Sequence, residues 1–117
     1  MKEFHKINLL FDFYGSLLTE RQQKFVELYY GDDWSLGEIA EQFAVTRQAV
    51  HDTLKRAEQI LNTYEAKLGL VRKLSGDYHS LEEIATLIHD YQTGVAPDGL
   101  DKSKQILQSV LDNWQRF

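Results

Sequence analysis

The chain has 117 residues, of which 43% are hydrophobic, enough for one domain with a modest core. It contains no cysteine, which excludes disulfide frameworks, thiolate metal sites and thiol nucleophiles. No apolar run approaches the length of a membrane span, and the N-terminus lacks the apolar block of a secretory signal peptide. These features predict a cytoplasmic protein that does not insert into membranes.

The formal net charge is −5, but the charge is unevenly distributed along the chain. Residues 1–45 carry a balance of −4, residues 46–74 a balance of +3, and residues 75–117 a balance of −4. Binding to nucleic-acid phosphates requires a local basic surface rather than a basic protein. The positive central segment therefore permits nucleic-acid binding despite the acidic total.

The apolar residues recur at helical spacing along almost the whole chain, and no stretch alternates with period two for long enough to predict a strand. We therefore expect an all-α fold of five or six helices. The first predicted helix covers about residues 3–18. Thr19 and Gln22 form a capping-box pattern that opens a second helix ending near Tyr30.

Residues 35–57 combine two helix starts and one tight turn, the pattern of a helix-turn-helix. Ser35 and Glu38 form a second capping box. Thr46 is the expected N-cap of the following helix. Ala40 and Ala49 are small, as the close approach of two short helices requires, and we expect Ala49 to face inward.

The helix that follows Thr46 extends beyond a minimal helix-turn-helix, and its apolar residues continue as one long stripe along the helix. Gly69 predicts its end or a hinge. A second apolar stripe follows over residues 74–88. Within it, Ser80 and Glu83 form a capping-box pattern that offers an alternative helix start near Leu81. A final helix follows the break at residues 94–99. We interpret residues 1–68 as a helical domain and residues 69–117 as a C-terminal helical extension.

These apolar stripes carry more side chains than one small domain is expected to bury, which predicts a homodimer or a higher oligomer. The alternative is that the C-terminal stripe packs on the first helix of the same chain. The residues that we assign to self-association are Leu61, Tyr64, Leu68, Leu107, Val110, Trp114 and Phe117.

Two resemblances accompany these patterns. Residues 35–58 resemble region 4 of bacterial sigma factors through the motifs Ser35-Leu36, Glu38-Ile39, Gln42-Phe43 and Val45-Thr46-Arg47. The whole chain is more similar to the YlxM-type proteins of Gram-positive bacteria. That similarity is carried by the motifs Asn8-Leu9-Leu10-Phe11-Asp12-Phe13-Tyr14-Gly15, Leu28-Tyr29-Tyr30, Ser35-Leu36-Gly37-Glu38-Ile39-Ala40, Arg47-Gln48-Ala49-Val50 and Tyr64-Glu65-x-Lys67-Leu68. The YlxM resemblance implies a gene beside those of the signal recognition particle, and an accessory or regulatory role in that pathway.

The candidate nucleic-acid contacts lie on the second helix of the motif, and their alternative reading is a solvated helix face. They are Arg47, Gln48, His51, Lys55 and Arg56. The sigma resemblance implies that Arg47 approaches bases or phosphates. Gln48, His51 and Asp52 differ from the sigma pattern, and an aspartate facing a groove repels phosphate. These differences argue against the base preference of sigma factors.

The sequence contains no arrangement typical of an enzyme or of a cofactor site. The four histidines lack metal-ligand spacing, and no nucleophile motif or phosphate-binding glycine loop is present. We therefore predict a non-enzymatic protein without cofactors. Its expected partners are nucleic acid, either DNA or, as the YlxM resemblance implies, the RNA of the signal recognition particle, with a protein of the particle as a further candidate. The alternative function is a sequence-specific DNA-binding transcriptional regulator unrelated to the particle.

Overall fold

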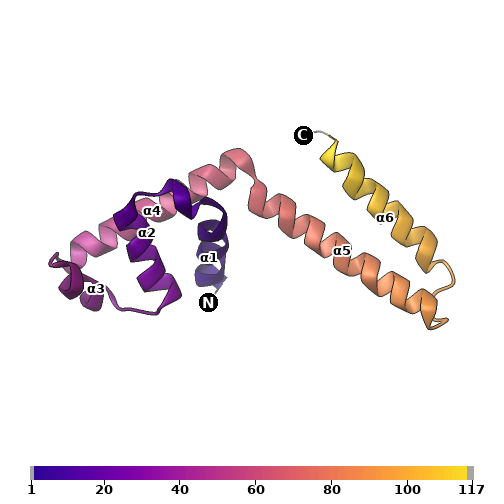
Figure 1. The fold of residues 1–117 in the computed structure, drawn as a ribbon, viewed down its shortest axis with the longest axis horizontal. Coiled ribbons are helices and arrows are strands. Elements are labelled where there is room, and N and C mark those ends of the chain that lie inside the picture. The colour runs from indigo at the N-terminus through magenta and orange to yellow at the C-terminus, as the bar shows by residue number, and fades with distance from the viewer. Residues whose placement is uncertain (1, 116–117) are drawn as a thin grey trace. The chain divides into compact units, whose positions relative to one another are not determined.

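A computed structural model describes residues 2–115 of the chain. Within that range it contains six α-helices and no strand, which confirms the all-α prediction (Figure 1). The described residues divide into two compact units, with the boundary between Val71 and Arg72. In the described residues, none of the helices combines the length and hydropathy needed to cross a membrane.

The first helix, α1, spans Lys2–Tyr14 and is shorter than predicted. It is followed by a 3-10 turn over Gly15–Leu17. The Phe11 ring lies against Gly15, where an added Cβ would stand only 2.7 Å from two ring atoms. The backbone then extends at Leu18, which brings Thr19 to the N-cap of the next helix. Packing at Gly15 thus ends the helix before its apolar periodicity does.

Helix α2 spans Glu20–Val26 and begins with the predicted capping box. The Gln22 amide donates to Thr19 Oγ1 at 3.2 Å, and the Thr19 amide donates to Gln22 Oε1 at 3.0 Å. We expected this helix to continue to Tyr30, but residues 27–31 form a wider π-helical turn. This turn buries Leu28 in the core. The local sequence carries no signal for it.

The core of the first unit is built around α4, which spans Arg47–Leu68. Its inward side chains pack with those of α1, α2 and of α3, which spans Leu36–Phe43. The buried apolar residues are Ile7, Leu10, Tyr14, Leu18, Phe25, Val26, Leu28, Ile39, Ala40, Val50, Leu54, Ala57 and Leu61. Because α4 contributes four of these at a spacing of three and four residues, its opposite side is left to solvent.

Gly69 ends α4 in the left-handed conformation, with φ 62°, as predicted. A hydrogen-bond network follows at this junction. Tyr14 Oη donates to Glu65 Oε1 at 2.7 Å and accepts from the Leu70 amide at 3.1 Å. Glu65 Oε1 also accepts from the Val71 amide at 3.1 Å. The network therefore satisfies the first amides of the next helix, and burial together with the bond to Glu65 raises the pKa of Tyr14.

The second unit is an antiparallel pair of helices lying side by side (Figure 1). Helix α5 spans Leu70–Gln92 without interruption, so the alternative start near Leu81 is wrong. Helix α6 spans Gly99–Trp114. A Cβ at Gly99 would lie 2.4 Å from the Leu87 carbonyl oxygen, so glycine permits this close approach of the two helices.

Candidate nucleic-acid interface

The predicted helix-turn-helix is present over α3 and the start of α4. Ser35 Oγ accepts from the Glu38 amide at 3.1 Å, and the Glu38 carboxylate accepts from the Ser35 amide at 3.0 Å. Ala44 turns the chain with a φ of 55°, and its left-handed conformation separates the two helices. Thr46 Oγ1 accepts from the Ala49 amide at 3.0 Å, which caps α4 as expected.

One detail of the motif was predicted wrongly. Ala40 is buried, but Ala49 is exposed rather than inward-facing. Val50, the next residue, is fully buried and takes the inward position. Since successive helix residues are a little more than a quarter turn apart, Val50 and Ala49 cannot both face the core centre.

Arg47 is exposed at the first turn of α4, and its side chain lies back along α3. A Cβ added at Gly37 would be 3.0 Å from Arg47 Nε and 3.1 Å from Nη2. Gly37 thus leaves the space that the guanidinium occupies beside the start of α3. Arg47 was predicted from the sequence, but the role of Gly37 was not, because the contact joins residues of two different helices.

Gln48 and His51 are exposed, and both side chains are close to Asp52. Gln48 Nε2 donates to Asp52 Oδ1 at 2.9 Å, and His51 Nδ1 lies 3.5 Å from the same oxygen. The Gln48 amide is therefore hydrogen-bonded to a carboxylate, and the His51 ring lies near the same carboxylate. The bond to Asp52 occupies one of the two N–H groups of the Gln48 amide and constrains the orientation of the side chain.

Lys55 and Arg56 are exposed one turn further along α4 and lie on different sides of it. Lys55 lines a cleft of about 240 Å³ together with Lys6, Tyr30 and Glu58. Arg56 lines a larger cleft on the other side. The structure thus carries all five candidate residues on the solvent side of α4, with basic groups along both of its edges.

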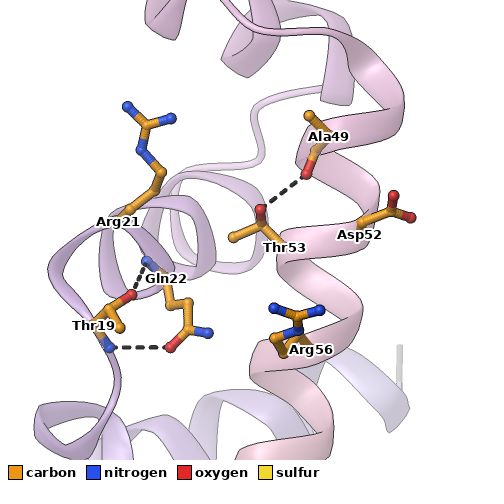
Figure 2. Close-up of a pocket in the computed structure, with 7 residues that line it drawn as sticks. All are labelled: Thr19, Arg21, Gln22, Ala49, Asp52, Thr53 and Arg56. Atoms are coloured by element: carbon orange, nitrogen blue, oxygen red, sulfur yellow. Dashed lines mark hydrogen bonds between the residues drawn. The ribbon is translucent and has the colours of Figure 1, made fainter.

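The larger cleft has a volume of about 410 Å³ and lies between α2 and α4 (Figure 2). It is lined by Thr19, Arg21, Gln22, Ala49, Asp52, Thr53 and Arg56. Arg21 was not among the predicted residues. Its guanidinium lies 5.7 Å from the Phe25 ring centroid and 5.9 Å from that of Phe43. The cleft brings arginines of two helices to one surface, a placement that only the folded chain reveals.

The residues assigned to self-association lie in different environments. Leu61 is fully buried in the core of its own chain, so its assignment to a contact with a second copy is wrong. The Tyr64 ring stacks on Tyr14 at 6.0 Å between centroids. Leu68 is 54% exposed, and Val110 is half-buried. Leu107 and Trp114 are 45% and 47% exposed, and Phe117 lies outside the described residues.

Among the described residues, no group of three or more histidine, aspartate or glutamate side chains is arranged to hold a metal ion. The carboxylates of the motif instead have structural partners. Ser35 lowers the pKa of Glu38, first through its backbone amide and second through its hydroxyl. Glu38 therefore serves as part of the cap of α3.

Comparison with known proteins places these features in one family. The family model that matches residues 1–97 is described as "UPF0122: Putative helix-turn-helix protein, YlxM / p13 like". A UPF0122 protein of Desulforamulus reducens is 68% identical, over 98% of this chain and 98% of its own length. UPF0122 protein BH2485 of Halalkalibacterium halodurans is 50% identical, over 75% of this chain and 81% of its own length.

Proposed function

Because this chain belongs to the UPF0122 family of YlxM / p13-like proteins, whose description is that of a helix-turn-helix, we propose that it binds nucleic acid through the exposed side of α4. We propose further that it acts as a non-enzymatic, cytoplasmic accessory or regulatory protein of the signal recognition particle pathway. The observation that carries the binding proposal is the position of the predicted contact residues. All five are exposed on the first three turns of α4, while Val50, Leu54 and Ala57 anchor the same turns in the core.

In this proposal the basic residues contact the nucleic-acid backbone. Arg47 stands at the start of the second helix of the motif, which is the end that approaches a groove in helix-turn-helix complexes. Lys55 and Arg56 stand about two to two and a half turns further along, and Arg21 lies across the cleft from Arg56 (Figure 2). Phosphate contacts from such groups position a protein but do not specify sequence.

Direct contacts with base edges contribute less to binding in this proposal than contacts with phosphates. Gln48 and His51 are the polar groups nearest the start of α4, and both are held near Asp52. Asp52 itself is exposed and brings negative charge to the surface that would meet phosphates. These contacts favour a binder with weak sequence preference over a promoter-reading protein.

The assignment to the signal recognition particle pathway is supported by the YlxM resemblance of the sequence motifs. It is compatible with binding to the RNA or to a protein of the particle. The negative charge on either side of the basic segment, −4 over residues 1–45 and −4 over residues 75–117, also disfavours tracking along duplex DNA.

Replacement of Asp52 tests whether this side of α4 meets nucleic acid. Asp52→Gln removes the negative charge and is expected to strengthen binding to generic duplexes severalfold, with a smaller effect at high salt. Asp112→Gln, on α6, is the control with the same charge change. Affinities are measured by fluorescence anisotropy at several salt concentrations. Equal effects of the two substitutions would mean that α4 has no special place in binding.

A pull-down from bacterial cytosol, with and without nuclease, separates the two proposed functions. We expect recovery of signal recognition particle RNA or protein, with loss of the RNA-dependent part after nuclease treatment. Recovery of one genomic operator and nothing from the particle would contradict the pathway assignment. It would support the alternative, a sequence-specific transcriptional regulator, while leaving nucleic-acid binding by α4 in place.

A further inference from the structure

The helical pair of the second unit lacks an apolar core of its own. Within residues 72–115, only Gly99 and Ser103 are buried. In the first unit, by contrast, thirteen apolar residues form one buried cluster. Two helices with apolar stripes need a further layer to cover them.

The sides on which α5 and α6 face each other are defined by specific contacts. Ser103 Oγ lies 3.5 Å from the Ile84 carbonyl oxygen, and Gly99 lies against Leu87. Near the other end of the pair, Trp114 Nε1 donates to Asp77 Oδ2 at 2.6 Å. These contacts fix the antiparallel register and assign positions 77, 84 and 87 of α5 to the mutual interface.

Each helix carries a second apolar stripe beside this interface. On α5 the stripe follows positions 74, 78 and 81, and on α6 it follows positions 100, 107, 111 and 114. At 3.6 residues per turn, the stripe on each helix lies about a quarter turn around the helix axis from the side that faces the other helix. Viewed from the N-terminus of each helix, this rotation has the same direction in both. Because the helices run antiparallel, equal rotations bring the two stripes to the same side of the pair.

The stripes thus join into one surface, the hairpin face. Its residues are Leu74, Tyr78, Leu81, Leu100, Leu107, Leu111 and Trp114. Each of them leaves between 39% and 65% of its surface exposed. Together they expose on the order of 700 Å², close to the roughly 800 Å² that each partner buries in a stable protein–protein interface. An apolar surface of this size is typical of a site that another protein covers.

The charges that border the hairpin face are complementary to those of a second copy. Glu82 borders the face on α5, and Lys104 borders it on α6, on the opposite edge. The Ser103–Ile84 contact sets residue 104 level with residue 83. A two-fold axis parallel to the helices would lay α5 of one copy on α6 of the other. Glu82 would then meet Lys104 of the second copy, at both edges of the bundle.

We propose that the hairpin face binds the same face of a second copy of this chain, forming a four-helix bundle in which neighbouring helices are antiparallel. The arrangement buries seven apolar side chains from each copy in a common core. It also brings two Glu82–Lys104 pairs together, as flanking charges do in coiled coils.

A matched pair of substitutions on α6 tests which surface associates. The wild-type chain should sediment as a dimer at micromolar concentration. Leu107→Glu places a charge in the hairpin face and should weaken the dimer by about tenfold or more, because the charge would be buried without a partner. Gln105→Glu adds the same charge on the other side of α6 and should leave the dimer unchanged. Circular dichroism checks that both variants remain helical.

A charge exchange tests the occupant and the orientation. Glu82→Lys and Lys104→Glu should each weaken the dimer severalfold, and the double substitution should restore it, because only a second copy supplies the complementary charge. A monomer at all concentrations would overturn the proposal. Equal dimer affinities for the Leu107→Glu and Gln105→Glu variants would overturn it as well.

Discussion

At the scale of single residues, the helix caps determine where the helix-turn-helix begins and how its stability depends on pH. Ser35 satisfies an amide at the start of α3 through its hydroxyl, and Glu38 returns the bond to the Ser35 amide. Both partners are exposed, yet together they fix the first turn of the helix that supports α4.

Removal of the Ser35 hydroxyl should therefore destabilise the first unit. Ser35→Ala is expected to cost about 1 kcal/mol of unfolding free energy, because the Glu38 amide loses its acceptor. Chemical denaturation followed by helical circular dichroism measures the change. Ser16→Ala, at an exposed position that caps no α-helix, is the control and should leave the denaturation midpoint nearly unchanged. Equal midpoints for all three proteins would contradict the role of this cap.

Because Glu38 is part of the cap, its ionisation should make the stability of the first unit depend on pH. Its pKa lies below the ordinary value of 4.5 in the folded chain because the Ser35 amide and hydroxyl donate to the carboxylate. A lowered folded pKa contributes stability that is present above the unfolded pKa and is lost as the pH falls through the folded pKa. The stability difference between the wild type and Glu38→Gln should therefore shrink below about pH 4.5. Urea denaturation between pH 3 and pH 6 measures it, and a difference independent of pH would contradict the prediction.

At the scale of elements, local signals predicted helix starts better than helix ends. Thr19, Ser35 and Thr46 cap helices through atoms no more than three residues away, so their patterns are visible in the sequence. The early end of α1 depends on how the Phe11 ring packs, and the π-helical turn after α2 accompanies the burial of Leu28.

The start of α5 shows why distant contacts escape a reading of the sequence. Ser80 and Glu83 match a capping box, but α5 already begins at Leu70. Its first amides are satisfied by Tyr14 and Glu65, and Tyr14 lies 56 residues before Leu70. The spacing along α4 predicted which candidate contact residues share the solvent side. The positions of Gly37 and Arg21 near that surface depend on the fold of the first unit.

Replacement by alanine should have opposite effects on stability at two glycines, one at the α4–α5 junction and one inside α5. Gly69 has a φ of 62°, which alanine adopts only with strain, so Gly69→Ala should destabilise the chain by about 1 kcal/mol. Gly76 is inside α5, with open space around it, so Gly76→Ala should stabilise the helix by about 0.5–1 kcal/mol. Thermal denaturation compares the two, and shifts in the same direction would contradict these assignments.

At the scale of the whole molecule, the two units have different physical characters. The first has a closed apolar core and an exposed basic side on α4, within the segment of positive charge. The second has no buried apolar cluster within its described residues and exposes the wide apolar hairpin face. We therefore propose that the first unit contacts nucleic acid and that the second unit contacts protein. In a dimer, two copies of the basic surface would be joined, which would increase the apparent affinity for long nucleic acids.

The central claim is that nucleic acid binds to the first turns of α4, and single charge removals along this helix test it most directly. Arg47→Ala, Lys55→Ala and the control Lys67→Ala each remove one exposed positive charge, at the start, the middle and the end of α4. Binding to fluorescent duplex DNA and to signal recognition particle RNA is followed by anisotropy at several salt concentrations. We predict that Arg47→Ala and Lys55→Ala each weaken binding about tenfold. Each should also reduce the slope of log affinity against log salt concentration by about one, whereas Lys67→Ala should change neither the affinity nor the slope. Equal losses for the three variants, or no binding by the wild type at low salt, would contradict the claim.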